Sequence, residues 1–161
     1  MKKALVFIIC FVFIFCGCKE KKEINTISKP FSAIVSIKKD NYKAKYKYSF
    51  VKTGECSFIS LNADNIDYSW KGNQCMLNSD NIQYKPQIEN IKNSPVVITK
   101  YAIEKSINQI ITPAHNGELV YYISGSYGEI KVNFNVDGYP ENFIAKNYDL
   151  EVKVSELEVD A

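Results

Sequence analysis

From residue 31 onwards, apolar and polar residues alternate with a period of two along much of the chain. In residues 42–50 the apolar positions are Tyr42, Ala44, Tyr46, Tyr48 and Phe50, and lysine or serine occupies the positions between them. This period is typical of a strand with one buried face, and it fixes the register because a slip of one residue would bury the lysines. Similar patterns predict strands at residues 31–38, 56–61, 66–70, 74–78, 82–85, 118–124, 130–136, 143–145 and 148–154.

Short turn sequences separate these predicted strands. Residues 39–41, 53–55, 71–73, 125–128 and 137–138 are rich in Gly, Asn and Asp, which are residues of tight hairpins. Brief connections between successive strands favour an antiparallel meander.

One segment has the signals of a helix. Residues 86–93 form a polar connection, and Ser94-Pro95 then offers an N-cap followed by proline at the first helical position. An apolar arc continues until Pro113, so we expect a helix from Pro95 to Gln109 or Ile111. The predicted fold class is therefore mainly β (α+β), with one main helix at about residues 95–110 in a single domain, residues 30–158.

The N-terminus has a different character. Lys2 and Lys3 precede an uncharged apolar run, residues 4–17. Fourteen residues span roughly 21 Å as a helix, which is short of the roughly 30 Å of a bilayer core. A positive start followed by a short apolar run indicates a secretory signal rather than a transmembrane anchor.

The end of this run resembles the signal of bacterial lipoproteins, with Gly17-Cys18 at its boundary and Phe15 and Cys16 at its outer positions. The resemblance implies a signal peptide at residues 1–17 and a diacylglyceryl thioether on Cys18, which becomes the new N-terminus. Two or more acyl chains give stable anchoring. The expected location is the extracytoplasmic side of the cell membrane. The alternative is an ordinary signal peptide with incidental cysteines.

After Cys18, residues 19–29 are polar, and we expect residues 18–29 to be a lipidated N-terminus and flexible tether. The chain contains no arginine. Without Lys2 and Lys3 its 20 basic side chains become 18, equal to its 18 acidic ones. A neutral exported domain without arginine is a poor nucleic-acid binder, so no nucleic-acid partner is expected.

Two cysteines, Cys56 and Cys75, remain in the predicted domain. An exported pair suggests a disulfide. If a third strand lies between them, they are about 9–10 Å apart and cannot bond. Both outcomes stay open. Two cysteines and one histidine are too few for a zinc site, so no metal or other cofactor is expected.

Several segments resemble small clostridial-type lipoproteins that look like relatives of the lipoprotein-carrier (LolA-like) superfamily. They are residues 30–33, 54–56, 68–72 and 135–140. The resemblance implies a strongly curved antiparallel sheet, or incomplete barrel, covered by helices with a hydrophobic cavity between them. The chain differs from the carriers in its own membrane anchor and its single predicted helix.

No arrangement of residues indicates catalysis. His115 lies in a turn-like segment, and we expect an exposed loop residue rather than a general base. Residues 124–126 lack the glycines of a nucleophile elbow. The chain is therefore expected not to be an enzyme.

Two surfaces are candidates for binding. The lysines at 43, 45 and 47 could attract anionic lipid headgroups or wall polymers, or could simply discourage edge pairing. Inward aromatic residues could form a core or line an apolar pocket; tyrosine favours a wet cavity, because its hydroxyl needs a partner when buried. The expected pocket-lining residues are Tyr46, Tyr48, Phe50, Tyr68, Trp70, Tyr84, Tyr101 and Phe134.

The leading expectation is thus a membrane-anchored lipoprotein that binds a lipid or other hydrophobic molecule between sheet and helix without catalysis. The alternative is a structural or interaction module of the cell envelope that uses the outer face of the sheet.

Overall fold

The computed structural model describes residues 22–62, 66–79 and 82–159. The expected signal peptide and Cys18 lie outside these residues. Among the described residues, no helix is long and apolar enough to cross a membrane.

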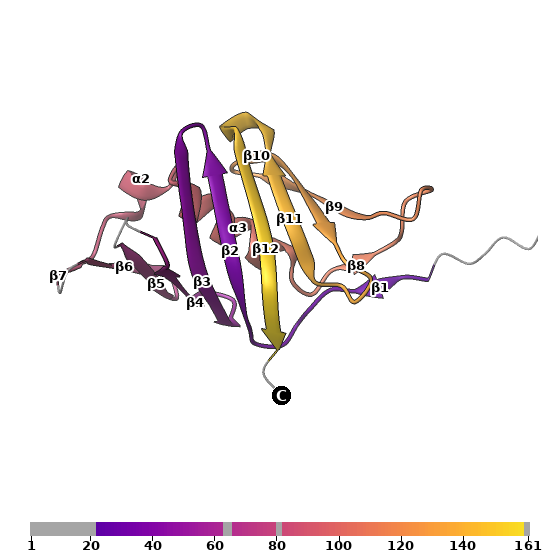
Figure 1. Cartoon of the computed structure of the whole chain (residues 1–161), viewed down its shortest axis with the longest axis horizontal. Coiled ribbons are helices and arrows are strands. Elements are labelled where there is room, and N and C mark those ends of the chain that lie inside the picture. The colour runs from indigo at the N-terminus through magenta and orange to yellow at the C-terminus, as the bar shows by residue number, and fades with distance from the viewer. Residues whose placement is uncertain (1–21, 63–65, 80–81, 160–161) are drawn as a thin grey trace, which may run out of the picture.

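Ten strands form one antiparallel sheet, which is curved and open (Figure 1). The first six strands are a meander, as the short turns predict: β2 (Phe31–Lys39), β3 (Tyr42–Lys52), β4 (Glu55–Ser60), β5 (Asp67–Lys71), β6 (Gln74–Ser79) and β7 (Ile82–Tyr84). The last four are a second meander: β9 (Leu119–Gly125), β10 (Gly128–Phe134), β11 (Pro140–Ala145) and β12 (Leu150–Val159). A short 3₁₀ helix, Lys146–Tyr148, joins β11 to β12.

The two meanders become one sheet because β12 pairs with β2 along almost its whole length. The spatial order is β7-β6-β5-β4-β3-β2-β12-β11-β10-β9. The predicted fold class is confirmed: mainly β, with an open, curved antiparallel sheet and one main helix.

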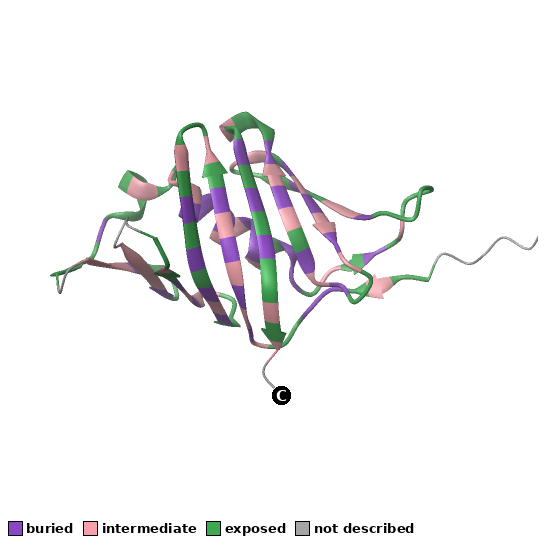
Figure 2. Ribbon diagram, viewed as in Figure 1, coloured by how far each residue is buried: buried purple, intermediate pink, exposed green. Residues whose placement is uncertain are grey.

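Alternating burial along the central strands follows the predicted period of two (Figure 2). In β3, Ala44, Tyr46, Tyr48 and Phe50 are buried, and the lysines between them are exposed. The buried side chains face the concave side of the sheet, where they meet the helix. Each large side chain buried there contributes roughly 1.5–3 kcal/mol to folding.

The main helix is α3 (Pro95–Ser106), which packs on the concave side against β2, β9, β10 and β11. Ser94 is its N-cap, as predicted: the Ser94 hydroxyl accepts a hydrogen bond from the Val97 amide at 3.3 Å, and Pro95 opens the helix. A second, short helix, α2 (Ile88–Ile91), lies in the segment predicted to be only a polar connection.

The helix ends earlier than expected. Ile107 is already extended, and Ile110–Ile111 form strand β8, which pairs with β1 (Ile24–Asn25). The prediction that the helix extends to Gln109 or Ile111 is wrong, because pairing with a distant segment takes the backbone groups that a further helical turn would use.

The folded domain also begins before Pro30. Thr26 and Ile27 are buried, and their amides donate hydrogen bonds to the carbonyls of Gln109 and Gly138 at 2.8 and 3.2 Å. The flexible tether expected to reach Lys29 is therefore too long: Ile24–Ile27 belong to the fold. A chain that starts at Lys19 keeps every described contact of the core.

Candidate functional site

Two rows of apolar side chains cross the concave face from β2 and β3 towards β7. Directly paired residues point to the same face, so the register defines each row. The first row consists of Phe31, Phe50, Cys56, Trp70 and Cys75, all buried. The second consists of Ala33, Tyr48, Phe58, Tyr68, Leu77 and Tyr84. Exposure in the second row rises from 0% at Tyr48 to 57% at Tyr84.

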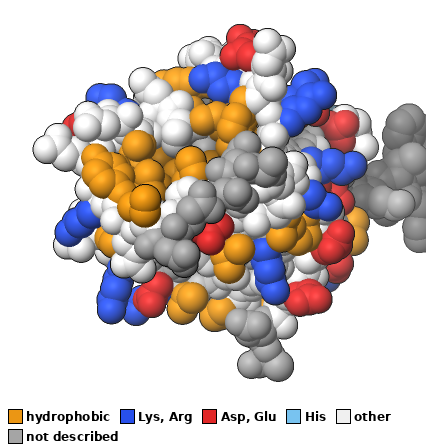
Figure 3. Space-filling model, turned by 60° about the vertical axis from the view of Figure 1, so that its left-hand side comes forward, with side chains coloured by type: hydrophobic (Ala, Val, Ile, Leu, Met, Phe, Trp, Pro, Cys, Tyr) orange, Lys and Arg blue, Asp and Glu red, His pale blue; other side chains and the backbone are white. Residues whose placement is uncertain are grey.

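The helix covers only part of this face. Because α3 packs against β2 and β9–β11, the part over β5 and β6 has less cover. Hydrophobic side chains gather at the surface on this side of the molecule (Figure 3), and the exposed ones include Ile82, Tyr84 and Ile88.

An open pocket of about 320 Å³ lies between α3 and the β5–β6 hairpin. This volume is at the lower end for small-molecule sites and equals about ten water molecules in the liquid. The lining residues come from the hairpin, from both helices and from the turn between β9 and β10: Trp70, Gly72, Asn73, Ile88, Val97, Lys100, Tyr101, Glu104 and Tyr127.

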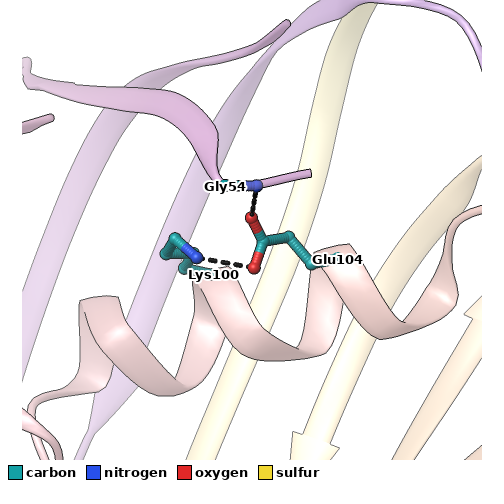
Figure 4. A network of polar contacts seen from close by, with 3 residues as sticks. All are labelled: Gly54, Lys100 and Glu104. Atoms are coloured by element: carbon teal, nitrogen blue, oxygen red, sulfur yellow. Dashed lines mark hydrogen bonds and ion pairs between the residues drawn. The ribbon is translucent and has the colours of Figure 1, made fainter. Parts of the chain in front are cut away.

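The polar wall of the pocket is an ion pair on one face of α3. Lys100 donates to Glu104 at 2.5 Å, and each side chain is only 14% exposed. The other carboxylate oxygen of Glu104 accepts a hydrogen bond from the Gly54 amide at 2.7 Å (Figure 4). Glu104 thereby connects α3 to the turn between β3 and β4, and it also neutralises the lysine.

The lysine of this pair also lies over the aromatic floor. Lys100 Nζ is 5.7 Å from the centroid of the Trp70 ring, a cation–π distance. Trp70 in turn stacks on Tyr68, with centroids 5.8 Å apart and an interplanar angle of 8°. The floor is therefore flat and aromatic.

The opposite wall consists of tyrosines. Tyr101 and Tyr127 make an edge-to-face contact with centroids 5.0 Å apart, and Tyr127 contacts Tyr148 in the same way at 5.8 Å. Partial burial, together with the neighbouring Tyr148 and Tyr101, raises the pKa of Tyr127, so its phenol stays neutral. The Tyr101 hydroxyl lies against Gly125, where a side chain would collide with it.

The structure divides the expected pocket-lining residues into three groups. Trp70 and Tyr101 line the pocket, and Tyr68 supports Trp70 from one side. Tyr46, Tyr48, Phe50 and Phe134 are buried in the core instead. Tyr84 does not line this pocket: it lies on the short edge strand β7 and is 57% exposed.

The hydroxyls of the buried tyrosines differ in their hydrogen bonding. Tyr46 shares a hydrogen bond with the Tyr42 hydroxyl at 2.9 Å. The Tyr48 hydroxyl has no hydrogen-bond partner within the described chain, and burial raises its pKa well above the usual value. The Cys56 thiol, a weak donor, lies beside it. The open pocket is lined by Tyr101 and Tyr127, whereas Tyr48 lies in the core.

Sequence reasoning missed Lys100, Glu104, Val97 and Tyr127. The spacing of Lys100 and Glu104 is that of a helical i,i+4 pair, so their interaction could have been expected. Their position over Trp70 could not, since it depends on where α3 crosses the sheet. Tyr127 lies in a turn, and no local pattern directs it to the pocket.

Cys56 and Cys75 are free thiols on either side of Trp70. Strand β5 separates them, so they are two strand spacings apart, about 9.5 Å. A disulfide needs Cα atoms within about 7 Å. The disulfide suggested by their number does not form. Burial raises the pKa of the Cys56 thiol to about 12 and that of the Cys75 thiol to about 11.

Within residues 22–62, 66–79 and 82–159, no three His, Cys, Asp or Glu side chains gather into a possible metal site. His115 is exposed in the loop before β9, as expected. The pocket thus presents aromatic surface and a neutralised ion pair, which suit non-covalent binding of an uncharged or apolar group.

In comparisons with known proteins, no family model matches this chain and no curated protein matches its sequence.

Proposed function

We propose that this chain is a membrane-anchored lipoprotein that binds a small hydrophobic ligand non-covalently in the pocket over Trp70. The observation that carries the proposal is the open aromatic pocket of about 320 Å³ beside an otherwise well-packed contact between helix and sheet. A single acyl chain or a compact ring system suits this volume better than a whole two-chain lipid.

Three features support a hydrophobic ligand. Trp70, Tyr101, Tyr127 and Val97 supply apolar surface, and burying such surface provides the driving force. Because Glu104 neutralises Lys100, the polar wall does not call for a charged ligand. A cavity between curved sheet and helix is also what the resemblance to lipoprotein carriers implies.

The anchor limits where such a ligand could be held. Between Cys18 and Ile24, the first residue of β1, the chain can extend about 20 Å. The binding domain would thus stay close to the membrane surface and act there, not as a free shuttle.

Binding can be followed through Trp70, because it is the only tryptophan in the chain. The chain from Lys19 to Ala161 is purified and its organic extract is analysed for co-purified lipid. It is then stripped and titrated with laurate and with laurate methyl ester, while Trp70 fluorescence is recorded. We expect the fluorescence change to saturate, and we expect the uncharged ester to bind more tightly than the charged laurate.

Two variants that introduce the same ring, one inside the pocket and one on the surface, test whether the ligand binds in the pocket. Val97→Phe places a ring into the pocket and should weaken binding of the ester at least tenfold. Val51→Phe adds the same ring at a side chain that is 52% exposed and should leave binding unchanged. Absence of both a co-purified lipid and a saturable fluorescence change would refute the proposed pocket. Mass spectrometry of the full chain from membranes tests the acylation of Cys18 separately.

A further inference from the structure

Five lysines lie together on the convex face of the sheet, opposite to the pocket. We call this set the lysine face: Lys38, Lys43, Lys45, Lys47 and Lys153, all exposed. The register places them side by side. Lys38 is directly paired with Lys43, while Lys45 and Lys153 are paired with Ser36 from its two sides. Three neighbouring strands, β3, β2 and β12, therefore contribute to one cationic surface.

Only a small part of this charge is balanced within the described chain, by Glu151, which is directly paired with Lys38 on β12. None of the five lysines forms an ion pair among residues 22–62, 66–79 and 82–159. Glu151 is the one carboxylate among the residues that line the hollow at the centre of the face. Like charges directly opposite each other, as in Lys38 and Lys43, oppose folding. An anion from outside the chain would relieve that repulsion.

Protection of a sheet edge accounts for only part of the lysine face. At one end of β3, Tyr42–Ala44 have no partner in β4, so Lys43 lies at an exposed edge, where lysine discourages strand pairing. Lys38 lies on β2, between β3 and β12, and Lys153 lies on β12, between β2 and β11. Edge protection does not explain cations on these interior strands.

The face also has the shape of a multi-point anion site. A shallow hollow of about 470 Å³ lies between Lys38, Lys43, Lys45 and Lys153, and Ser36 and Asn62 add polar groups to its lining. Lysine carries a compact point charge that suits phosphate groups without demanding a fixed planar geometry. Several spaced point charges fit an array of phosphates better than one enclosed anion.

We propose that the lysine face docks on the anionic phospholipid headgroups of the membrane surface. The choice of a membrane over another polyanion rests on the proposed lipid anchor, which would hold the domain within about 20 Å of that surface. At such a high effective concentration, weak contacts by several lysines suffice. β1, where the chain enters the domain, lies at one end of the sheet, so the convex face can lie flat on the bilayer (Figure 1). The pocket on the concave side then faces away from the headgroups.

The test uses the chain from Lys19 to Ala161, which lacks Cys18, so its result does not depend on acylation. Binding is measured by sedimentation with vesicles of phosphatidylcholine alone and of phosphatidylcholine with 30% phosphatidylglycerol. We expect binding to the anionic vesicles only, and weakening between 50 and 500 mM NaCl. The fourfold variant Lys38→Gln, Lys43→Gln, Lys45→Gln, Lys153→Gln should bind about 100- to 1,000-fold more weakly.

A matched variant distinguishes the effect of the lysine face from the effect of net charge. Replacing Lys22, Lys29, Lys85 and Lys105 by glutamine removes the same charge from exposed positions outside the lysine face and should weaken binding less than tenfold. Circular dichroism and urea unfolding show whether both variants keep the fold. Equal losses in the two variants, or no binding to anionic vesicles, would overturn the proposal. Tighter binding to a soluble glycerol phosphate polymer at equal phosphate concentration would also overturn it, in favour of a wall polymer.

Discussion

At the scale of single residues, Glu104 connects the helix to the sheet. It accepts from the Gly54 amide on one oxygen and from Lys100 on the other, and both charged side chains are largely buried. A largely buried cation that loses its partner is destabilising, whereas replacing both charges by apolar groups can be neutral. The main role of Glu104 is thus to pair with Lys100 and the Gly54 amide, and the net stability that the ion pair adds is small.

Glu104→Gln should lower the free energy of unfolding by about 1–3 kcal/mol, since Lys100 then lacks its counter-charge and Gly54 a charged acceptor. In urea unfolding, the double variant with Lys100→Met should recover part of the loss. The exposed pair of Lys92 and Glu89 provides the control, and Glu89→Gln should change stability by less than about 0.5 kcal/mol. Equal effects of the two glutamine variants would contradict the role of Glu104.

The buried thiols give the fold an alkaline limit. The pKa of Cys56 is raised to about 12 and that of Cys75 to about 11, mainly by burial, so both bind a proton more tightly in the folded chain than in the unfolded one. Their contribution to stability is therefore complete below pH 9 and is lost as the pH rises from about 9 towards 12.

We expect stability measured by urea unfolding to fall as the pH rises from 9 to 11, and to fall less steeply in Cys56→Ala. At pH 8 a thiol reagent should leave both cysteines unmodified until the chain unfolds, because the reactive species is the thiolate. Rapid modification of the folded chain at pH 8 would show that the thiols are not buried as described.

At the scale of elements, the N-terminal segment depends on one glycine. Gly138 has a positive φ of 81°, and a side chain there would collide with the backbone carbonyl of Asn25. Its own carbonyl accepts the hydrogen bond from the Ile27 amide. The turn between β10 and β11 therefore needs glycine both for its own conformation and for the approach of β1.

Gly138→Ala should destabilise the fold by about 2–3 kcal/mol and expose the amides of Thr26 and Ile27 to hydrogen exchange. Gly117→Ala is the matched control, because Gly117 has a similar φ of 84° but open space around it. That variant should lose only the conformational part, about 1 kcal/mol, and keep both amides protected. The same exchange pattern in both variants would contradict the docking of β1 on Gly138.

At the level of the whole molecule, the helix covers one part of the sheet more fully than the part that ends at β7. The helix packs over β2 and β9–β11, and burial in the second apolar row declines from Tyr48 on β3 to Tyr84 on β7, while the first row stays buried as far as Cys75. β7 is short, and all three of its residues are exposed. Local stability should follow this gradient, because strands with few buried contacts open at lower cost than the core.

Native-state hydrogen exchange should therefore be slowest in β2, β3 and β12 and fastest in β6 and β7. A ligand in the pocket over Trp70 should slow exchange in β5 and β6 selectively, while the central strands change little. Equal protection of the backbone amides in all strands of the sheet would contradict this gradient of local stability, whether or not a ligand binds in the pocket.

Features that depend on near neighbours follow from the amino-acid sequence alone. The period of two in residues 42–50 set which side of β3 is buried, and Ser94-Pro95 set the start of α3. Strand faces and helix caps are local, since they depend on residues one to four positions apart.

Features that join distant segments depend on tertiary contacts instead. Pairing of Ile24–Asn25 with Ile110–Ile111 ended the helix early and drew the expected tether into the fold. The position of β7 at the sheet edge left Tyr84 exposed, and β5 between Cys56 and Cys75 kept the thiols apart. The pocket itself depends on where α3 crosses the sheet. Each of these outcomes depends on contacts between residues far apart in the chain, which local periodicity does not specify.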